Sequence, residues 1–457
     1  MNPNKKRRDF LKQSVAGSLG IALSTLPSNA TETVPHSTSD SGYKALVCVL
    51  LEGGADTFNM LIPRQRKSYR KYRRLRGELA VARETLLPID TEYGFRGNMG
   101  EMQRLYREKK LAVVANVGTL VEPVTPRQVR EGSKKIPFEL FAHNTQRKQW
   151  MFADATGNTH NGWGARAADR LYATSDPARS YCAINTADIN TLLFSGGRKD
   201  PLHFTEPSIS PDTMRRYGFG PESGGAAFGR VYQHLYALQQ SNRNPLQATM
   251  ARQRIHELNL PVKLEGLFDG VRDFDGFTTG VHEVGKPLGS QLELVAQTLS
   301  VKDRFPARPR RQIFFVDHHN WDTHDSDNEH QAGYLSDSLG AFQKAMEELG
   351  MEEEVTLLTL SDFGRSLTPN GAGTDHGWGT FAFVMGGAVN GGNIYGKMPR
   401  IQRNSPDAWY DRLVPALSME SYLATLLAWM GLSEDELDLV LPNLRNFPTR
   451  NLGFMRG

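Results

Sequence analysis

The stretch Ile313-Phe314-Phe315-Val316 runs directly into Asp317-His318-His319-Asn320-Trp321-Asp322-Thr323-His324. This junction between an apolar and a polar segment is the main indication of the fold. The apolar part is typical of a buried β-strand, and the polar part after it is typical of a loop. A second apolar strand, Val355 to Leu360, runs in the same way into Ser361-Asp362-Phe363-Gly364-Arg365. Carboxylates and imidazoles therefore gather just after strand ends. In open α/β sheets this edge is where ligands bind, so we expect the functional site there.

Strands and helices alternate along the rest of the chain. Ala45 to Leu51 and Leu111 to Gly118 are continuous apolar runs, which suit central parallel strands covered on both faces. Between them, Met99 to Lys110 carries its apolar residues on one helical face. This order predicts a βαβ unit and an α/β fold. Similar patterns predict helices at 162–171, 290–299, 335–349 and 418–430, and a further strand at 381–385.

Two loops after the first strands offer further polar groups. The first strand ends in Glu52-Gly53-Gly54-Ala55-Asp56-Thr57-Phe58-Asn59, where glycines allow a tight turn and Asp56 and Asn59 offer oxygen atoms. The alternative is an ordinary turn capped by Asp56. After the second strand, a helix that begins near Asn144 would have free N–H groups for an anion. The alternative there is a simple helix cap, with His143 on the surface.

The N-terminus carries an export signature. Lys5-Lys6-Arg7-Arg8-Asp9-Phe10-Leu11-Lys12 is a twin-arginine motif, followed by a mildly apolar run and a small-residue cleavage site that ends at Ala30. We therefore expect a signal peptide at residues 1–30, recognised by the twin-arginine export machinery, and a periplasmic or extracellular protein. The alternative is a basic disordered tail. The apolar run is too short for a stable membrane span.

Charge and composition narrow the classes of partner. Residues 1–30 hold five Lys/Arg and one Asp, a net charge of +4, and the whole chain is also +4, so the remainder is close to neutral. Nothing in this balance favours nucleic acid or a membrane surface as the partner. Residues 31–42 are rich in Ser and Thr and predict a flexible linker. The main domain is expected at 43–445, with a helical insertion at about 194–285. Cys48 lies in an apolar strand and is expected to be a buried free thiol.

Six acidic or imidazole residues follow predicted strands or lie in the loops after them: Asp56, Asp322, His324, Asp362, Asp375 and His376. Divalent metals need such convergent oxygen and nitrogen donors. The competing interpretation is that these residues cap turns and bond to one another.

Four motifs in order carry a resemblance: 53–59, Trp321-Asp322-Thr323-His324, 361–365 and Gly373-Thr374-Asp375-His376-Gly377. With the twin-arginine leader, the chain resembles the secreted bacterial family called domain of unknown function 1501, from about Lys44 to Pro442. That family is grouped with the alkaline phosphatase and sulfatase superfamily. The resemblance implies an alkaline phosphatase-like three-layer α/β/α sandwich with a mostly parallel central sheet and metal-dependent chemistry at its carboxyl edge.

The resemblance also implies roles for individual residues. The metal ligands would be Asp56, Asp322, His324, Asp362 and His376, with zinc, calcium or magnesium as the ion. Phe363 stands where active superfamily members have a metal-binding His, so half of a two-metal site is in doubt. The segment around His143 matches the nucleophile region, where Thr145 is the nearest hydroxyl.

The resemblance thus leaves two functions open. One is a metal-dependent hydrolase of phosphate or sulfate esters, small or polysaccharide, in which Thr145 or a water at the site attacks. His143 would then assist, Arg365 would bind the anion with its planar fork, and Asn59 or Asn144 would donate to another oxygen. For Arg365 the alternative is a salt bridge to a neighbouring Asp. The other function is a non-catalytic envelope or polysaccharide-binding protein with a degenerate metal site.

Overall fold

The computed structural model describes residues 42–187, 191–208, 227–239, 247–248, 251, 255, 263–277 and 285–456. Residues Gly42–Gly457 form one compact unit. The predicted signal peptide and all but the last residue of the predicted linker lie outside the described residues, as does much of the expected insertion at about 194–285. Within that insertion, the helix α8 (Ala227–Gln239) is described.

The core is a nine-stranded sheet with the order β13-β5-β12-β9-β1-β8-β6-β7, and β16 pairs with β5. Only β12 runs antiparallel to its neighbours, so the expected mostly parallel central sheet is confirmed. The strands are β1 (Lys44–Leu51), β5 (Leu111–Gly118), β6 (Ala183–Asn185), β7 (Leu202–His203), β8 (Arg311–His318), β9 (Val355–Ser361), β12 (Thr380–Met385), β13 (Ile394–Tyr395) and β16 (Leu417–Ser418).

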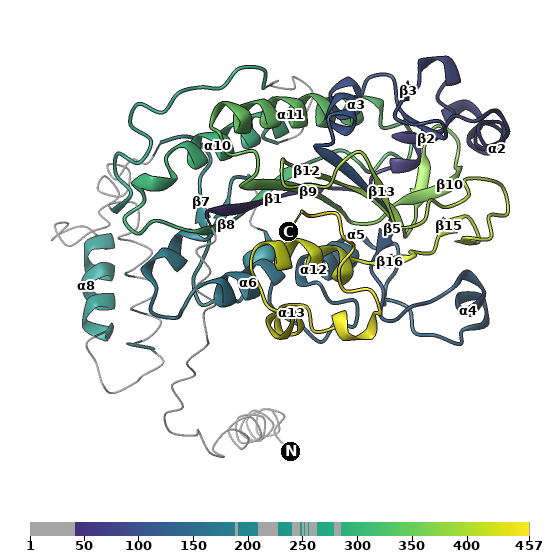
Figure 1. The fold of residues 1–457 in the computed structure, drawn as a ribbon. Helices are drawn as coiled ribbons and strands as arrows, with labels where there is room; N and C mark the ends of the chain where they lie inside the picture. The colour runs from purple at the N-terminus through teal and green to yellow at the C-terminus, as the bar shows by residue number, and fades with distance from the viewer. Residues whose placement is uncertain are drawn as a thin grey trace, which may run out of the picture. The chain divides into compact units, whose positions relative to one another are not determined.

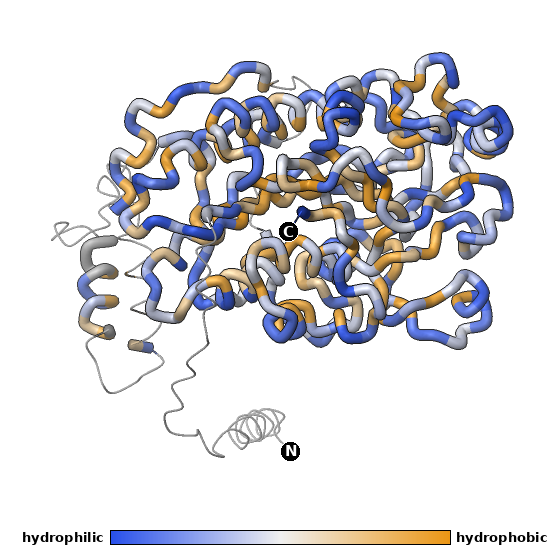
Figure 2. Tube along the Cα trace, viewed as in Figure 1, coloured by the Kyte–Doolittle hydropathy of each residue, from blue (hydrophilic) through white to orange (hydrophobic). Residues whose placement is uncertain are grey.

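Helices cover both faces of the sheet (Figure 1). One layer holds α3 (Gly100–Arg107), α10 (Leu288–Ser300) and α11 (Glu329–Glu348), and the other holds α5 (His143–Phe152), α6 (Trp163–Leu171), α12 (Met419–Trp429) and α13 (Glu434–Val440). The reason is visible in β1, where successive side chains point to opposite faces. Val47 and Val49 pack in the first layer's core, and Leu46 and Cys48 in the second. Figure 2 shows the apolar strands between these layers.

Smaller elements surround one end of the sheet. A three-stranded sheet is formed by β2 (Leu61–Pro63), β3 (Leu87–Pro88) and β4 (Tyr93–Phe95), and α2 (Arg66–Arg76) lies beside it. Two hairpins are β10 (Arg365–Pro369) with β11 (Thr374–His376), and β14 (Ala408–Trp409) with β15 (Arg412–Leu413). α4 (Pro126–Glu131) is a short helix. Short 3-10 helices lie at Thr57–Asn59, Gly77–Leu79, Arg83–Thr85, Pro177–Tyr181, Leu192–Phe194, Lys302–Arg304 and Leu444–Asn446.

The structure corrects one sequence expectation and confirms another. The segment around Thr374 and His376, expected as a glycine-rich loop, forms the β10–β11 hairpin. Cys48 is free and buried as expected, and Cys182 is too. Across the described residues, we find no helix with the length and apolar content needed to traverse a bilayer.

Candidate metal centre

The register of three parallel strands brings the site's loops together. Leu51 at the end of β1 pairs with His318 at the end of β8 and with Ser361 at the end of β9. The two glycines after β1 let these loops touch. A Cβ on Gly53 would lie 2.4 Å from the backbone nitrogen of Asp322, and a Cβ on Gly54 would lie 2.5 Å from the ring of Phe363. Both glycines have positive φ, 117° and 83°, which other residues rarely adopt.

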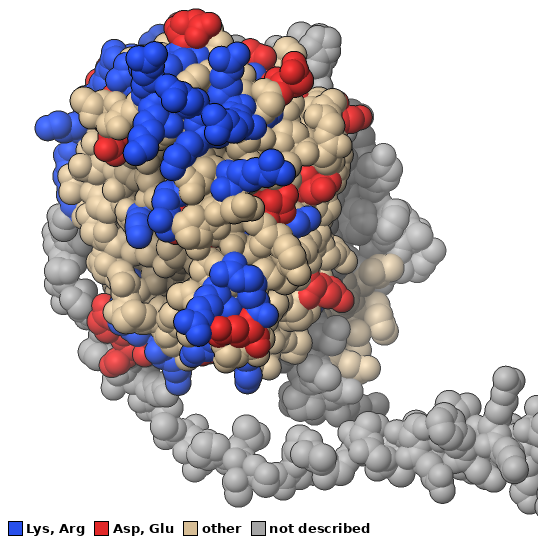
Figure 3. Space-filling view, turned by 90° about the vertical axis from the view of Figure 1, so that its right-hand side faces the viewer, with Lys and Arg blue, Asp and Glu red and all other residues tan. Residues whose placement is uncertain are grey.

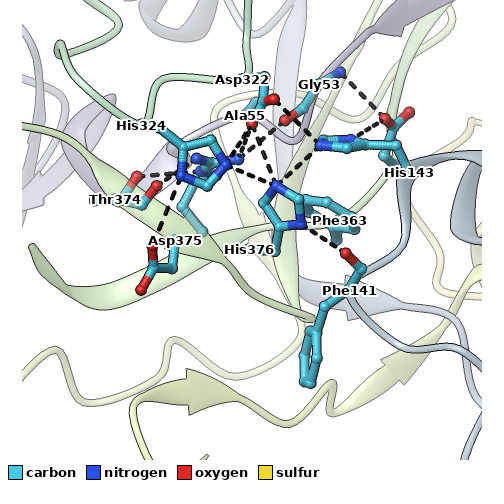
Figure 4. A network of polar contacts seen from close by, with 12 residues as sticks. Gly53, Ala55, Phe141, His143, Asp322, His324, Phe363, Thr374, Asp375 and His376 are labelled. Atoms are coloured by element: carbon cyan, nitrogen blue, oxygen red, sulfur yellow. Dashed lines mark hydrogen bonds and ion pairs between the residues drawn. The ribbon is translucent and has the colours of Figure 1, made fainter. Parts of the chain in front are cut away.

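Three imidazoles and one carboxylate meet at this edge (Figure 4). We call His143, Asp322, His324 and His376 the histidine group. The Nε2 atom of His376 lies 3.0 Å from Nε2 of His143 and 2.8 Å from Nε2 of His324. The Asp322 carboxylate lies 3.4 Å from Nε2 of His143, 3.1 Å from Nε2 of His324 and 3.4 Å from Nε2 of His376. Residues from a helix, a loop and a hairpin therefore aim their donor atoms at one point.

The hydrogen-bond partners assign the imidazole tautomers. His376 donates from Nδ1 to the carbonyl oxygen of Phe141 at 2.6 Å, and His143 donates from Nδ1 to Asp362 Oδ2 at 2.8 Å. If both rings are neutral, each Nε2 atom carries a lone pair and no hydrogen, and the two lone pairs face each other. Outward Nδ1–H bonds of this kind orient imidazoles that bind metal. Facing lone pairs beside a carboxylate are satisfied by a shared proton or by a metal ion between them.

The spacing of the donor atoms also suits a metal ion. Two ligand atoms that are each about 2.05 Å from a tetrahedral zinc ion lie about 3.3 Å apart. The separations among His143 Nε2, His376 Nε2 and the Asp322 carboxylate are 3.0, 3.4 and 3.4 Å. His143, Asp322 and His376 therefore fit a divalent cation. His324 lies on the exposed side of the same point.

Local electrostatics favour the metal-binding forms of these side chains. Burial lowers the pKa of His376; the hydrogen bond to Phe141 opposes this, and the positive charge of Arg365 lowers it further. Burial raises the pKa of Asp322, but the hydrogen bond and the positive charge of Arg365 act in the opposite direction, and the pKa is lowered overall. A neutral imidazole and an ionised carboxylate are the forms that bind metal.

A second set of ionisable residues lies at the same edge. We call Glu52, Asp317 and His319 the His319 group. His319 contacts Glu52 through Nδ1, and its Nε2 atom lies 3.1 Å from Asp317 Oδ2. These two carboxylates, Asp317 first, raise the pKa of His319 to about 10. His319 is therefore an imidazolium that neutralises part of the group's negative charge.

Arg147 links the two groups. Its guanidinium contacts Glu52, and its Nε atom lies 3.3 Å from Asp362 Oδ1. Asp362 is fully buried and also accepts from the backbone N–H of Gly53 at 3.2 Å. Asp362 therefore acts on the histidine group through His143, as an orienting carboxylate.

Phe363 packs against the histidine group. Its ring centroid lies 4.7 Å from that of His143 and 4.8 Å from that of His376. It is buried and offers no donor atom. An apolar ring thus occupies the position where the resemblance implied a metal-binding His.

Two predicted residues after β1 lie in other contacts. Asp56 is 2% exposed and forms an ion pair with Arg76, whose Nη1 also donates to the carbonyls of Ser366 and Leu367. Asn59 donates to the carbonyl of Leu79 and accepts from the hydroxyl of Tyr72. The structure does not bring either side chain to the histidine group.

Three further predicted residues also have internal partners. The Thr145 hydroxyl donates to the Glu139 carboxylate, and Asn144 Oδ1 accepts from the backbone N–H of Thr145. Arg365 is fully buried and donates from Nη1 to Asp322 Oδ1 at 2.8 Å and to the carbonyl of Gly53 at 3.2 Å. Its fork therefore holds the site's loops, which matches the salt-bridge alternative.

Sequence reasoning missed four residues at this edge: Glu52, Arg147, Asp317 and His319. The signals were present, since Glu52 follows β1 directly and Asp317 is the next-to-last residue of β8, followed by two histidines. Arg147 lies on α5, one turn after His143, so the two side chains share a helix face.

Several solved structures have a similar chain course. They include the C-terminal periplasmic domain of EcEptC from Escherichia coli in complex with Zn (12% identity, 86% of this chain and 84% of that chain, TM-score 0.36). Others are the PsFucS1 sulfatase from Pseudoalteromonas sp. (10%, 92% and 74%, TM-score 0.33) and alkaline phosphatase from the Antarctic bacterium TAB5 (10%, 78% and 94%, TM-score 0.28). All three TM-scores lie below 0.5.

A comparison with curated protein sequences finds no match. The family described as protein of unknown function (DUF1501) matches residues 283–437, a segment that holds Asp322, His324 and His376. Over residues 283–437, the chain is therefore similar to the DUF1501 family.

Proposed function

We propose that this protein is a metal-dependent hydrolase of phosphate or sulfate esters. The observation that supports this most directly is the pair of facing Nε2 lone pairs of His143 and His376 beside the Asp322 carboxylate. A divalent cation held there would neutralise charge on the ester oxygens in the transition state. Because two of the three donors are imidazoles, zinc suits the site better than magnesium or calcium.

Different residues would have different roles at this site. His143, Asp322 and His376 hold the cation, while Asp362 and the carbonyl of Phe141 fix the two imidazoles. Arg365 keeps Asp322 ionised and in place. The side chain of His324 is 43% exposed, so it is the imidazole that an arriving ester meets first. We propose that water attacks the phosphorus or sulfur of the ester, and that His324 transfers a proton to the leaving oxygen as its bond breaks.

The test combines metal analysis with two assays. The purified protein should contain about one zinc-class ion per chain and should cleave 4-nitrophenyl phosphate or 4-nitrophenyl sulfate. His376→Ala should lose both the ion and the turnover. His324→Gln should keep the ion and lose most of the turnover of phenyl phosphate or phenyl sulfate, whose leaving group is poorer than 4-nitrophenol, and less of the turnover of the 4-nitrophenyl esters. A wild-type protein with no ion and no turnover on either ester contradicts the proposal.

A non-catalytic binding protein is the second candidate. It is favoured by the Thr145 hydroxyl, which is bound to Glu139, and by the Phe363 ring against the histidine group. If this candidate is right, the protein retains its ion and an anionic ligand but turns over neither ester. Phosphate ions would then stabilise the wild type against heat, and would not stabilise His376→Ala.

We also propose that the protein is exported by the twin-arginine machinery to the periplasm or beyond, on the N-terminal motif at Arg7-Arg8. Fusing residues 1–42 to a reporter protein tests this. Arg7→Lys with Arg8→Lys should abolish its export, and an unchanged export would contradict the proposal.

A further inference from the structure

Two surface features flank the β10–β11 hairpin, which carries His376, and neither is used by the metal centre. One is an aromatic group of Phe141, Trp409 and Tyr410, and the other is the basic helix α2. Figure 3 shows the face of the molecule on which lysine and arginine side chains gather near the position of α2 in Figure 1.

The aromatic group is attached to the metal centre. The ring of Phe141 stacks on Trp409 at 6.1 Å, and Trp409 lies 5.5 Å from Tyr410. The carbonyl oxygen of Phe141 accepts from His376, while the Phe141 ring points away from the imidazoles (Figure 4). Arg412 covers Phe141 at 5.0 Å and donates to the carbonyl of His376 at 2.9 Å. A ligand on these rings would therefore lie next to the site.

The side chain of Tyr410 is exposed, and its backbone has an unfavourable conformation. It is 78% exposed, more than any other large apolar or aromatic residue that the structure describes. Its φ is 54°, in the left-handed region that is uncommon for a bulky residue. A strained backbone that presents an exposed ring indicates a contact surface. Flat aromatic rings of this kind pack against the C–H faces of sugar rings.

The basic helix α2 exposes six cations: Arg66, Lys67, Arg70, Lys71, Arg73 and Arg74. None of the six is in an ion pair with another described residue. Its buried side carries Tyr72 and Arg76, and Arg76 bonds to Asp56 and to β10. Like charges that are crowded on one face repel each other, so this face gains most from a polyanionic ligand.

The hairpin joins both features into one surface. Arg76 of α2 donates to the carbonyl of Leu367 in β10, and the N–H of Leu367 donates to the carbonyl of Asp411, next to Tyr410. In Figure 1, α2 and β15, the strand that follows Tyr410, lie on either side of β10 and both contact it. A ligand that contacts both must be a polymer and not a small monoester.

The chemistry of the surface selects the class of polymer. Membrane-surface helices insert apolar residues, but the exposed residues of α2 are cations with Gln65 and Gly77 at its ends. Single-stranded nucleic acid needs a row of exposed rings along the basic groove, and the tyrosines of α2, Tyr69 and Tyr72, are turned inward to bond with the carbonyl of Val81 and with Asn59. Sugar rings beside anionic substituents match both halves of the surface.

We propose that this face binds a polysaccharide that carries several sulfate or phosphate groups, with a sugar ring on Tyr410 and Trp409 and anionic groups along α2. The proposal deepens the proposed function, on which it rests for the ester at the metal centre. The substrate class would be a polyanionic polysaccharide.

Affinity electrophoresis in gels that contain dextran sulfate or unsulfated dextran tests this binding. We expect dextran sulfate to retard the wild type. Tyr410→Ala should weaken the retardation roughly tenfold, and Arg70→Gln with Arg74→Gln roughly fivefold at low salt. The matched controls, Tyr236→Ala and Arg308→Gln with Lys344→Gln, replace exposed residues elsewhere and should bind like the wild type.

The outcomes separate this proposal from the proposed function. His376→Ala should bind dextran sulfate normally while it loses ester turnover, so the binding surface is tested even if the protein is no enzyme. Wild-type protein that ignores dextran sulfate, or controls that weaken binding as much as Tyr410→Ala, would overturn the proposal. So would stronger retention by anionic lipid vesicles or by single-stranded DNA.

Discussion

The histidine group and the His319 group both contain imidazoles and carboxylates at the same edge of the sheet, but their imidazoles make different hydrogen bonds. In the histidine group, the Nδ1 hydrogens of His143 and His376 are given to outside acceptors, so lone pairs converge. In the His319 group, both ring nitrogens face carboxylates, so the ring carries two hydrogens and a positive charge. The placement of the hydrogens, and not the residue types alone, distinguishes the proposed metal centre from the group that carries its own positive charge.

The difference between the two groups indicates which clusters of acids and imidazoles are suited to bind a metal ion. A histidine between two carboxylates supplies its own cation, and such a cluster is complete without an ion. Two histidines that each donate away from the cluster leave a deficit of positive charge at its centre. We therefore expect the two groups to respond differently to mutation.

The largest expected effect is the loss of metal from the histidine group. His376→Ala should lower metal affinity and ester turnover by at least about a hundredfold, because it removes one of three donors. His319→Gln should keep the ion, because that ring already serves as a cation. Metal content after dialysis, measured by mass spectrometry, checks both. Equal metal loss in the two variants would break the comparison.

A third acidic residue, Asp56, gives a further test of the comparison between the two groups. Asp56 is buried against Arg76, so Asp56→Asn should cost about 3 kcal/mol of unfolding free energy by leaving the guanidinium unpaired. The metal content should not change, because the structure does not bring Asp56 to the histidine group. Denaturant unfolding and metal analysis of the same preparation give both numbers. Loss of the ion in folded Asp56→Asn protein would restore Asp56 as a ligand.

The charge on His319 predicts a pH dependence of stability. Its folded pKa of about 10 lies above the ordinary value of 6.5, so the stabilisation is fully present below about pH 6.5 and is lost as the pH rises through 10. Metal-free wild type should therefore lose stability between these pH values relative to His319→Gln. Unfolding midpoints at several pH values measure this difference. Parallel curves for the two proteins would mean that His319 is not held as an imidazolium.

The smallest effect is expected at Arg147, which joins the two groups. Arg147→Met should weaken metal binding only a few-fold, because Asp362 keeps its bonds to His143 and Gly53. Lys148→Met, on the same helix, is the matched control. Competition with a chelator gives the relative affinities. A loss as large as that in His376→Ala would mean that the groups act as one unit.

The sequence predicted the strands well because parallel strands that are covered on both faces must be continuously apolar. β1, β8 and β9 each match a predicted run, and with them the position of Asp322, Asp362 and His376 near one edge. The direction of β12 could not be predicted, since an apolar run looks alike in both directions. The β10–β11 hairpin was missed because its glycines resemble those of a loop.

The choice between Glu52 and Asp56 shows where sequence reasoning ends. Both acids follow β1, and either one could face the other loops. The backbone at Gly53 and Gly54, with φ of 117° and 83°, turns the chain so that Glu52 lies at the edge and Asp56 is buried against Arg76. A pair of glycines tells that a turn is present, but not which neighbour it aims inward.

The strand order has a consequence for how the proposed metal centre forms. β1 lies between β8 and β9, although both follow it by more than 250 residues in the chain. The loops that carry Asp322 and Asp362 therefore reach the loop after β1 only through long-range strand pairing, and such distant pairings form slowly. A cation that this centre holds would be taken up only after these strands have paired.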